Sequence, residues 1–128
     1  MDAAYRQAYL SGNYAALEEV FAPDAVEVNP AGVFRGGPAI RGLAEAFIRA
    51  NPGTTISYGE TTVVENTAVH RAFVASDPIR ETGVERIVLL HTLVVSQGKA
   101  ITLTSAWDPG DPETMRYLAA VAPAMDAG

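Results

Sequence analysis

The chain has 128 residues, with 9 Lys and Arg against 15 Asp and Glu, which gives a formal net charge of -6. This length predicts a single domain, residues 1–128, with a buried core. The acidic balance argues against nucleic acid and membrane surfaces as partners, because both bind a basic face. The absence of Cys excludes disulfides, thiolate metal ligands and a cysteine nucleophile. No signal peptide or spanning segment is recognisable near the N-terminus, so we expect a cytoplasmic protein.

Two short helices are predicted at the N-terminus. Apolar residues recur at helical spacing over residues 5–10 and 14–21, and residues 11–13 (Ser-Gly-Asn) separate the two stretches. The hydroxyls of Tyr5 and Tyr9 then point from one helix face toward whatever that helix covers.

Residues 25–29 predict a short strand that Pro30 ends. Its two valines alternate with Glu27 and Asn29, so one side of the strand carries a carboxylate and an amide. In an apolar pocket the pKa of Glu27 would be raised and the group could act as acid or base. Alternatively, Glu27 could face solvent or pair with Arg35, and Asn29 could cap the turn that follows.

A third helix is predicted to begin at residues 36–38, where Gly-Gly is followed by Pro in the first helical turn. Its apolar residues recur at helical spacing and include Leu43 and Phe47. We expect these two side chains to close the narrow end of a cavity.

Residues 54–64 and 67–76 predict two strands linked near residues 65–66. His70, on the second strand, faces inward by alternation and could belong to the core or contact a substrate.

Apolar residues between 115 and 125 could form a terminal helix over the pocket. Helices followed by antiparallel strands indicate an α+β fold with helices packed on one face of a curved sheet.

Residues 84–108 predict a β-hairpin, and its loop decides which side chains share a face. A three-residue loop pairs Val95 with Lys99 and places a glycine where φ is positive. A two-residue loop, Gln97-Gly98, would slip the register and send His91 to the other face. We prefer the three-residue loop. The pocket face of the hairpin then carries His91, Leu103, Ser105 and Trp107.

The opposite face of the hairpin is also largely apolar, so both faces should be covered. Its aliphatic set is Val84, Val88, Leu90 and Val94. A monomer would expose them as a larger contiguous patch than is usual. We therefore expect a homodimer formed through the outer sheet face.

The order of two helices, FAPDAVEVNP, a Gly-Gly-Pro turn with AIRGLAEAF, and long strands ending in GKAITLTSAWD resembles the nuclear-transport-factor-like superfamily over nearly the whole chain. That superfamily includes SnoaL-like polyketide cyclases, ketosteroid isomerases and limonene epoxide hydrolases. The resemblance implies a cone-shaped, curved antiparallel β-sheet whose concave face is covered by three helices from the N-terminal half. One such scaffold hosts enzymes, binding modules and transport adaptors.

The resemblance implies site residues from several activities. Tyr5 falls where ketosteroid isomerases keep an oxyanion-hole tyrosine, and His91 falls near the second donor. Asn29 falls where those isomerases place an aspartate base, although an amide cannot accept a proton at neutral pH. Epoxide hydrolases resemble the chain at Asn29, a water-positioning amide, and near Asp108, close to their final aspartate. Polyketide cyclases carry a histidine like His91, but their aspartate aligns with Ser105.

Two functional hypotheses follow. The first is a cofactor-free enzyme that acts on a small apolar oxygenated molecule, with a role in natural-product biosynthesis. Its reaction would be an isomerisation, a cyclisation or the opening of an epoxide. His91 or Glu27 would move the proton, and Asn29 and Tyr5 would orient oxygen or water. The second is a pocket that sequesters or senses such a molecule without catalysis. Apart from either hypothesis, His91 could be a core or interface residue, and Tyr5 could bury its ring and donate a hydrogen bond to a backbone carbonyl. No metal site is predicted. The expected substrate contacts are Tyr9, Leu43, Phe47, His70, Leu103, Ser105, Trp107 and Asp108.

Overall fold

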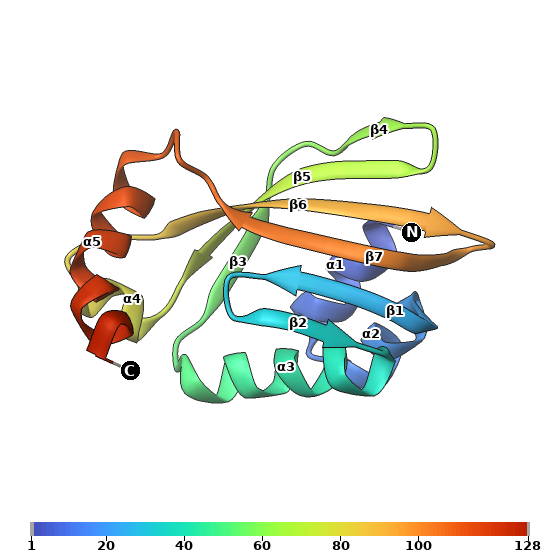
Figure 1. Ribbon diagram of the computed structural model, residues 1–128, viewed down its shortest axis with the longest axis horizontal. Helices are drawn as coiled ribbons and strands as arrows, with labels where there is room; N and C mark the ends of the chain where they lie inside the picture. The colour runs from blue at the N-terminus through green and yellow to red at the C-terminus, as the bar shows by residue number, and fades with distance from the viewer. Residues whose placement is uncertain (1, 128) are drawn as a thin grey trace.

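The computed structural model describes the backbone of residues 2–127 and the side chains of residues 3–121 (Figure 1). Helices α1 (Asp2–Ser11) and α2 (Tyr14–Val20) confirm the two predicted N-terminal helices. Gly12 lies between them with a φ of 69°, a conformation that a residue without Cβ adopts easily. The Asn13 side chain accepts a hydrogen bond from Ala16 N at 3.1 Å and so caps α2.

The strands form a single sheet. Their order is β2-β1-β7-β6-β5-β3, and β4 also pairs with β5, next to the residues of β5 that pair with β3. The bounds are β1 (Phe21–Asn29), β2 (Gly32–Arg35), β3 (Thr55–Tyr58), β4 (Thr62–Val64), β5 (Thr67–Ala75), β6 (Ile87–Ser96) and β7 (Lys99–Trp107). Residues 54–64 thus form two strands instead of the predicted one, because the chain leaves β5 between Gly59 and Thr61 and pairs with it again.

One strand pair departs from the predicted antiparallel sheet. Strands β1 and β7 run parallel, whereas β1–β2, β3–β5, β4–β5, β5–β6 and β6–β7 are antiparallel. The two parallel strands are about three-fifths of the chain apart in sequence. Local turns cannot fix the direction of such a distant pair, so the hairpin pattern did not predict it.

The hairpin has the two-residue turn, so the preference for a three-residue loop was wrong. Ser96 pairs with Lys99, and the turn residues Gln97 and Gly98 have φ values of 53° and 76°. Positive φ at both positions is typical of a type I′ turn, whose twist matches that of the flanking strands.

A bulge in β7 nevertheless preserves the predicted face. Ala100 and Thr102 pair with consecutive residues of β6, so Ile101 between them is an extra residue. Beyond it the register shifts by one, and His91 pairs with Ser105. The predicted pocket face is therefore correct, although it results from a bulge that the sequence pattern did not indicate.

The predicted cover of three N-terminal-half helices is confirmed. Helix α3 (Gly37–Ala50) starts with Pro38 in its first turn, and it lies with α1 and α2 against the curled sheet (Figure 1). Helices α4 (Asp77–Glu81) and α5 (Pro112–Ala127) lie where β5 ends and β6 begins. The main core, between helices and sheet, consists of Tyr5, Ala8, Leu17, Val20, Phe21, Ala25, Ile40, Ala44, Ala68, Leu93, Ala100 and Leu103.

The expected outer patch is smaller than predicted. Val84 and Val88 are only 4% and 1% exposed, because the chain itself covers them. Val84 packs in a second core cluster, and Val88 N donates to Thr114 Oγ1 of α5 at 2.8 Å. Leu90 and Val94 stay half-buried. The homodimer remains a prediction that rests on these two residues. Within the described part of the chain, no helix is long and apolar enough to cross a bilayer.

Candidate functional site

A cavity of about 370 Å³ lies between the concave face of the sheet and the helices. That volume is within the range of small-molecule sites, which are mostly apolar with a few convergent polar groups. Its walls are largely aliphatic and aromatic. The side chains with polar atoms along them are Tyr5, Tyr9, Glu27, Asn29, Asn51, Tyr58, His91, Ser105, Trp107 and Tyr117.

Most of the predicted site residues line this cavity. They come from α1, β1, α3, β6 and β7, which are distant in sequence and meet only in the fold. The predicted residues found on the wall are Tyr5, Tyr9, Glu27, Asn29, Leu43, Phe47, His91, Leu103, Ser105 and Trp107. Two others, His70 and Asp108, are not among the residues that line it.

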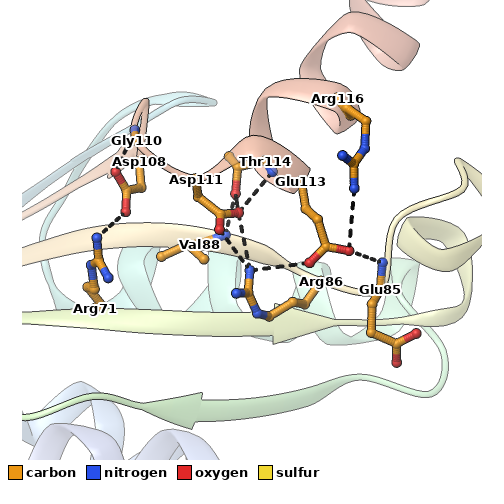
Figure 2. A network of polar contacts seen from close by, with 10 residues as sticks. All are labelled: Arg71, Glu85, Arg86, Val88, Asp108, Gly110, Asp111, Glu113, Thr114 and Arg116. Carbon is orange, nitrogen blue, oxygen red and sulfur yellow. Dashed lines mark hydrogen bonds and ion pairs between the residues drawn. The ribbon is translucent and has the colours of Figure 1, made fainter.

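Asp108, an expected substrate contact, does not line the cavity, and its carboxylate binds other residues of the protein. The residue is 5% exposed, and its carboxylate pairs with Arg71 Nη2 at 2.8 Å (Figure 2). It also accepts a hydrogen bond from Gly110 N at 2.9 Å. The carboxylate therefore stabilises the turn between β7 and α5, which the spacing from Trp107 alone did not reveal.

His70 faces inward as predicted, but it lies behind the cavity wall. It is 2% exposed, and its Nε2 lies 3.1 Å from His91 Nδ1, at hydrogen-bond distance. His91, which pairs with it across β5 and β6, does line the cavity. His70 therefore contacts a wall residue without being one itself, and its expected contact with substrate stays a prediction.

The strand register aligns polar side chains across the sheet. His91 on β6 pairs with Ser105 on β7 and with His70 on β5. On the parallel side Val28 pairs with Thr104, so the next residue, Asn29, lies beside Ser105. We call Asn29, Ser105, His91 and His70 the polar row. It crosses four adjacent strands of an otherwise apolar concave face.

Glu27 and Asn29 form a hydrogen-bonded pair at one side of the cavity. Asn29 Nδ2 donates to Glu27 Oε2 at 2.6 Å, and Asn29 Oδ1 accepts from Ala31 N at 2.8 Å. The turn after β1 thus holds the amide with its NH₂ group toward the carboxylate. Both expectations for Asn29 are met, because it caps the turn and also reaches the cavity.

The pKa values of Glu27 and Tyr9 give these two residues different roles in proton transfer. Burial raises the pKa of Glu27, and the hydrogen bond from Asn29 opposes that effect without cancelling it. Burial also raises the pKa of Tyr9, with smaller contributions from Tyr58 and Glu27. Tyr9 therefore keeps its proton at neutral pH and can donate a hydrogen bond, whereas Glu27 can accept a proton.

Sequence reasoning missed several wall residues. Tyr58 on β3 meets His70 edge-on, with ring centroids 5.0 Å apart, and the Arg6 guanidinium lies over the Tyr58 ring at 5.4 Å from its centroid. Alternation from Ile56 could have indicated it. Tyr117 packs on Trp107 at 5.9 Å, so α5 does reach the cavity as the tail pattern suggested. Asn51 lines the wall beyond α3.

The SnoaL-like domain model matches residues 2–117 of this chain. The chain belongs to the SnoaL-like family. Every residue that lines the cavity, from Tyr5 to Tyr117, lies inside the matched range. The resemblance to the nuclear-transport-factor-like superfamily is thereby confirmed. Among curated proteins, none matches this sequence.

Solved structures share the fold of this SnoaL-like protein. A candidate polyketide cyclase from Sinorhizobium meliloti is 26% identical, with a TM-score of 0.70 over 80% of this chain and 89% of that one. A candidate ketosteroid isomerase from Kribbella flavida is 14% identical, with a TM-score of 0.70 over 86% and 76%. A candidate isomerase of the SnoaL-like family from Agrobacterium tumefaciens is 16% identical, with a TM-score of 0.67 over 80% and 93%. These likenesses concern the fold.

Proposed function

We propose that this SnoaL-like protein is a cofactor-free enzyme that moves a proton on a small, mostly apolar, oxygenated molecule. The observation that carries the proposal is the Glu27 carboxylate, which is half-buried at the wall of an apolar cavity and hydrogen-bonded to Asn29 at 2.6 Å. A carboxylate whose pKa is raised toward neutrality is suited to take a proton and return it. Isomerisation or cyclisation that begins by removing a proton from the carbon next to a carbonyl requires such a group.

The opposing side of the reaction needs hydrogen-bond donors. When Glu27 removes a proton next to a carbonyl, negative charge develops on the carbonyl oxygen, and donors placed beforehand stabilise that oxygen. Tyr9 supplies a hydroxyl that stays protonated, and Ser105 and His91 supply further polar groups on the same concave face. We assign the proton transfer to Glu27 and the stabilisation of the oxygen to these three.

The arrangement favours carbonyl chemistry over epoxide opening. The epoxide hydrolase comparison depended on Asp108, which is paired with Arg71 and does not line the cavity. Asn29, the proposed water-positioning amide, is hydrogen-bonded to Glu27 and to the turn at Ala31. Relatives described as candidate polyketide cyclases and isomerases agree with the carbonyl proposal.

A non-catalytic binding pocket is the second candidate. It is supported by the small exposure of two residues proposed for chemistry, since His91 is 7% and Ser105 8% exposed. Side chains so deeply placed could serve only to shape the cavity and satisfy one another. This alternative predicts ligand binding with no proton exchange.

Proton exchange on a simple probe distinguishes the two candidates. The probe is 2-tetralone, an apolar ketone with acidic hydrogens next to its carbonyl, incubated with the protein in D₂O and followed by NMR. We expect exchange faster than in buffer, and Glu27→Gln should slow it about 100-fold, the scale of one acid-base group. Glu60→Gln, at an exposed position outside the cavity, is the matched control and should leave the rate unchanged. Equal rates with and without Glu27 would contradict the proposal.

A further inference from the structure

The two histidines of this protein, the only ones in its sequence, form a buried pair. His70 Nε2 and His91 Nδ1 are 3.1 Å apart, and the ring centroids are 5.0 Å apart with an interplanar angle of 64°. His70 is 2% and His91 7% exposed. Of the two, only His91 lines the cavity. Through this contact His70 can affect the protonation of His91, the histidine that lines the cavity.

A hydrogen bond between two neutral imidazoles contains one proton, and its position decides the chemistry of both rings. If His70 donates from Nε2, then His91 Nδ1 is the acceptor and the N–H of His91 must be on Nε2. If His91 donates from Nδ1, its Nε2 is unprotonated and acts as an acceptor. The same contact can therefore make His91 a donor or a base, and the partner ring selects between them.

Aromatic rings surround the pair. The Tyr5 ring meets His91 edge-on at 6.1 Å and lies 6.3 Å from His70, and the Tyr58 ring meets His70 edge-on at 5.0 Å. The Arg6 guanidinium is 5.4 Å from the centre of the Tyr58 ring. A neutral imidazole has one donor nitrogen, so the choice of tautomer matters.

The division of roles in the cavity indicates which tautomer is useful. Glu27 already provides the proton acceptor, so the group needed at the substrate oxygen is a donor. We propose that His70 is a positioning residue: its Nε2–H donates to His91 Nδ1 and holds His91 as a neutral donor through Nε2–H. The proposal rests on the proposed function for the direction of the hydrogen bond. It assigns a task to His70, which does not line the cavity.

Two histidines make the tautomers directly measurable. In protein labelled with ¹⁵N-histidine, long-range ¹⁵N–¹H spectra contain only four ring nitrogens, and protonated and unprotonated nitrogens have well-separated shifts. At mildly alkaline pH we expect His91 to carry its proton on Nε2, with Nδ1 unprotonated. A His91 proton on Nδ1 would overturn the proposal. This measurement needs neither substrate nor turnover.

Two variants of His70 test whether it causes this state. His70→Gln keeps an N–H that can donate to His91 Nδ1, whereas His70→Phe keeps a ring but has no donor. We expect His91 to stay in the Nε2–H tautomer with glutamine and to lose that preference with phenylalanine. An unchanged His91 tautomer in His70→Phe, with a cooperative thermal transition, would also overturn the proposal. Val69→Thr, on the outward face of the same strand, is the matched control.

Exchange kinetics give a second readout that separates this inference from the proposed function. With 2-tetralone, His70→Phe should lower kcat about 10- to 100-fold with little change in KM, and His70→Gln should restore most of the loss. If the tautomers behave as expected but the wild-type protein catalyses no exchange, the proposed function fails and the role of His70 over His91 stands. If exchange occurs but His70→Phe leaves kcat and the tautomer unchanged, the inference fails alone.

Discussion

Carboxylates in two regions of this protein have opposite electrostatic behaviour. Glu27 in the cavity has a raised pKa, whereas the pKa of Asp111 at the start of α5 is lowered. Burial acts in the same direction on both groups, so it does not explain the difference. The number and charge of the hydrogen-bond donors around each carboxylate do.

Asp111 belongs to a polar network that anchors α5 to the sheet (Figure 2). Its Oδ2 accepts from Thr114 N at 3.0 Å and Thr114 Oγ1 at 2.7 Å, and Arg86 Nη1 lies 3.1 Å away. Arg86 also approaches Glu113 at 3.7 Å. Burial raises the pKa of Asp111, but these hydrogen bonds and the positive charge of Arg86 outweigh it. The ionised form is therefore the stable one.

Glu27 receives much less compensation. The hydrogen bond that lowers its pKa comes from the neutral amide of Asn29, and it does not overcome the effect of burial. Hydrogen-bond donors and neighbouring charges, more than burial, therefore distinguish a carboxylate that stabilises the fold from one that can react. It also predicts which substitutions affect activity and which affect stability.

The largest expected effect concerns proton exchange. Glu27→Gln should reduce the exchange rate on 2-tetralone about 100-fold, because the amide cannot take the proton. Asp111→Asn should change that rate less than about threefold, since Asp111 lies outside the cavity. Rates by NMR in D₂O check both. A comparable loss in the two variants would show that the comparison does not separate catalysis from anchoring.

The next effect is on stability. Asp111→Ala should lower the free energy of unfolding by about 1–2 kcal/mol, because it removes the cap of α5 and the partner of Arg86. Glu27→Gln should instead raise stability at neutral pH, because it removes a poorly compensated buried charge. Urea denaturation measures both changes. Destabilisation by Glu27→Gln would indicate that the carboxylate is better stabilised than its environment suggests.

The pH dependence should also differ in sign. The pKa of Glu27 is higher in the folded state than its ordinary value of 4.5, so its ionisation lowers stability as pH rises through the folded-state value. The advantage of Glu27→Gln should therefore fade toward pH 4.5. The pKa of Asp111 is lower than its ordinary 3.8, so its contribution is present above 3.8 and is lost as pH falls through the folded-state value. Thermal unfolding of the wild type, Glu27→Gln and Asp111→Ala at several pH values checks these two pH dependences.

The smallest effect on the folded monomer is expected at the outer face. Val94 is half-buried there, so Val94→Asp should alter monomer stability only slightly. If the predicted homodimer forms through this face, the same change should dissociate it, because the interface would bury an unpaired charge. Sedimentation of wild type and variant distinguishes the cases. A monomeric wild-type protein at micromolar concentration would remove the dimer prediction.

Local sequence patterns predicted α1, α2, α3 and α5, most strand positions and the family, but they did not indicate α4 or β2. Gly12 between two helical patterns, Pro38 at a helix start and the alternation along β6 are local signals, because each depends on the conformation of a few adjacent residues. The same alternation places Glu27 and Asn29 on one side of their strand, but it left open whether that side faces the cavity or solvent. Their roles remain predictions.

Tertiary structure alone decided the rest, because it depends on pairs of residues that are distant along the chain. The parallel pairing of β1 with β7 brought Asn29 beside Ser105, and the bulge at Ile101 placed Ser105 opposite His91. Asp108 is paired with Arg71 on a strand that a local pattern cannot bring near it. His70 lies behind His91 only because β5 and β6 pair in this register. Local patterns fix which way a side chain points within its own strand, and only the packed sheet decides which other side chain it meets.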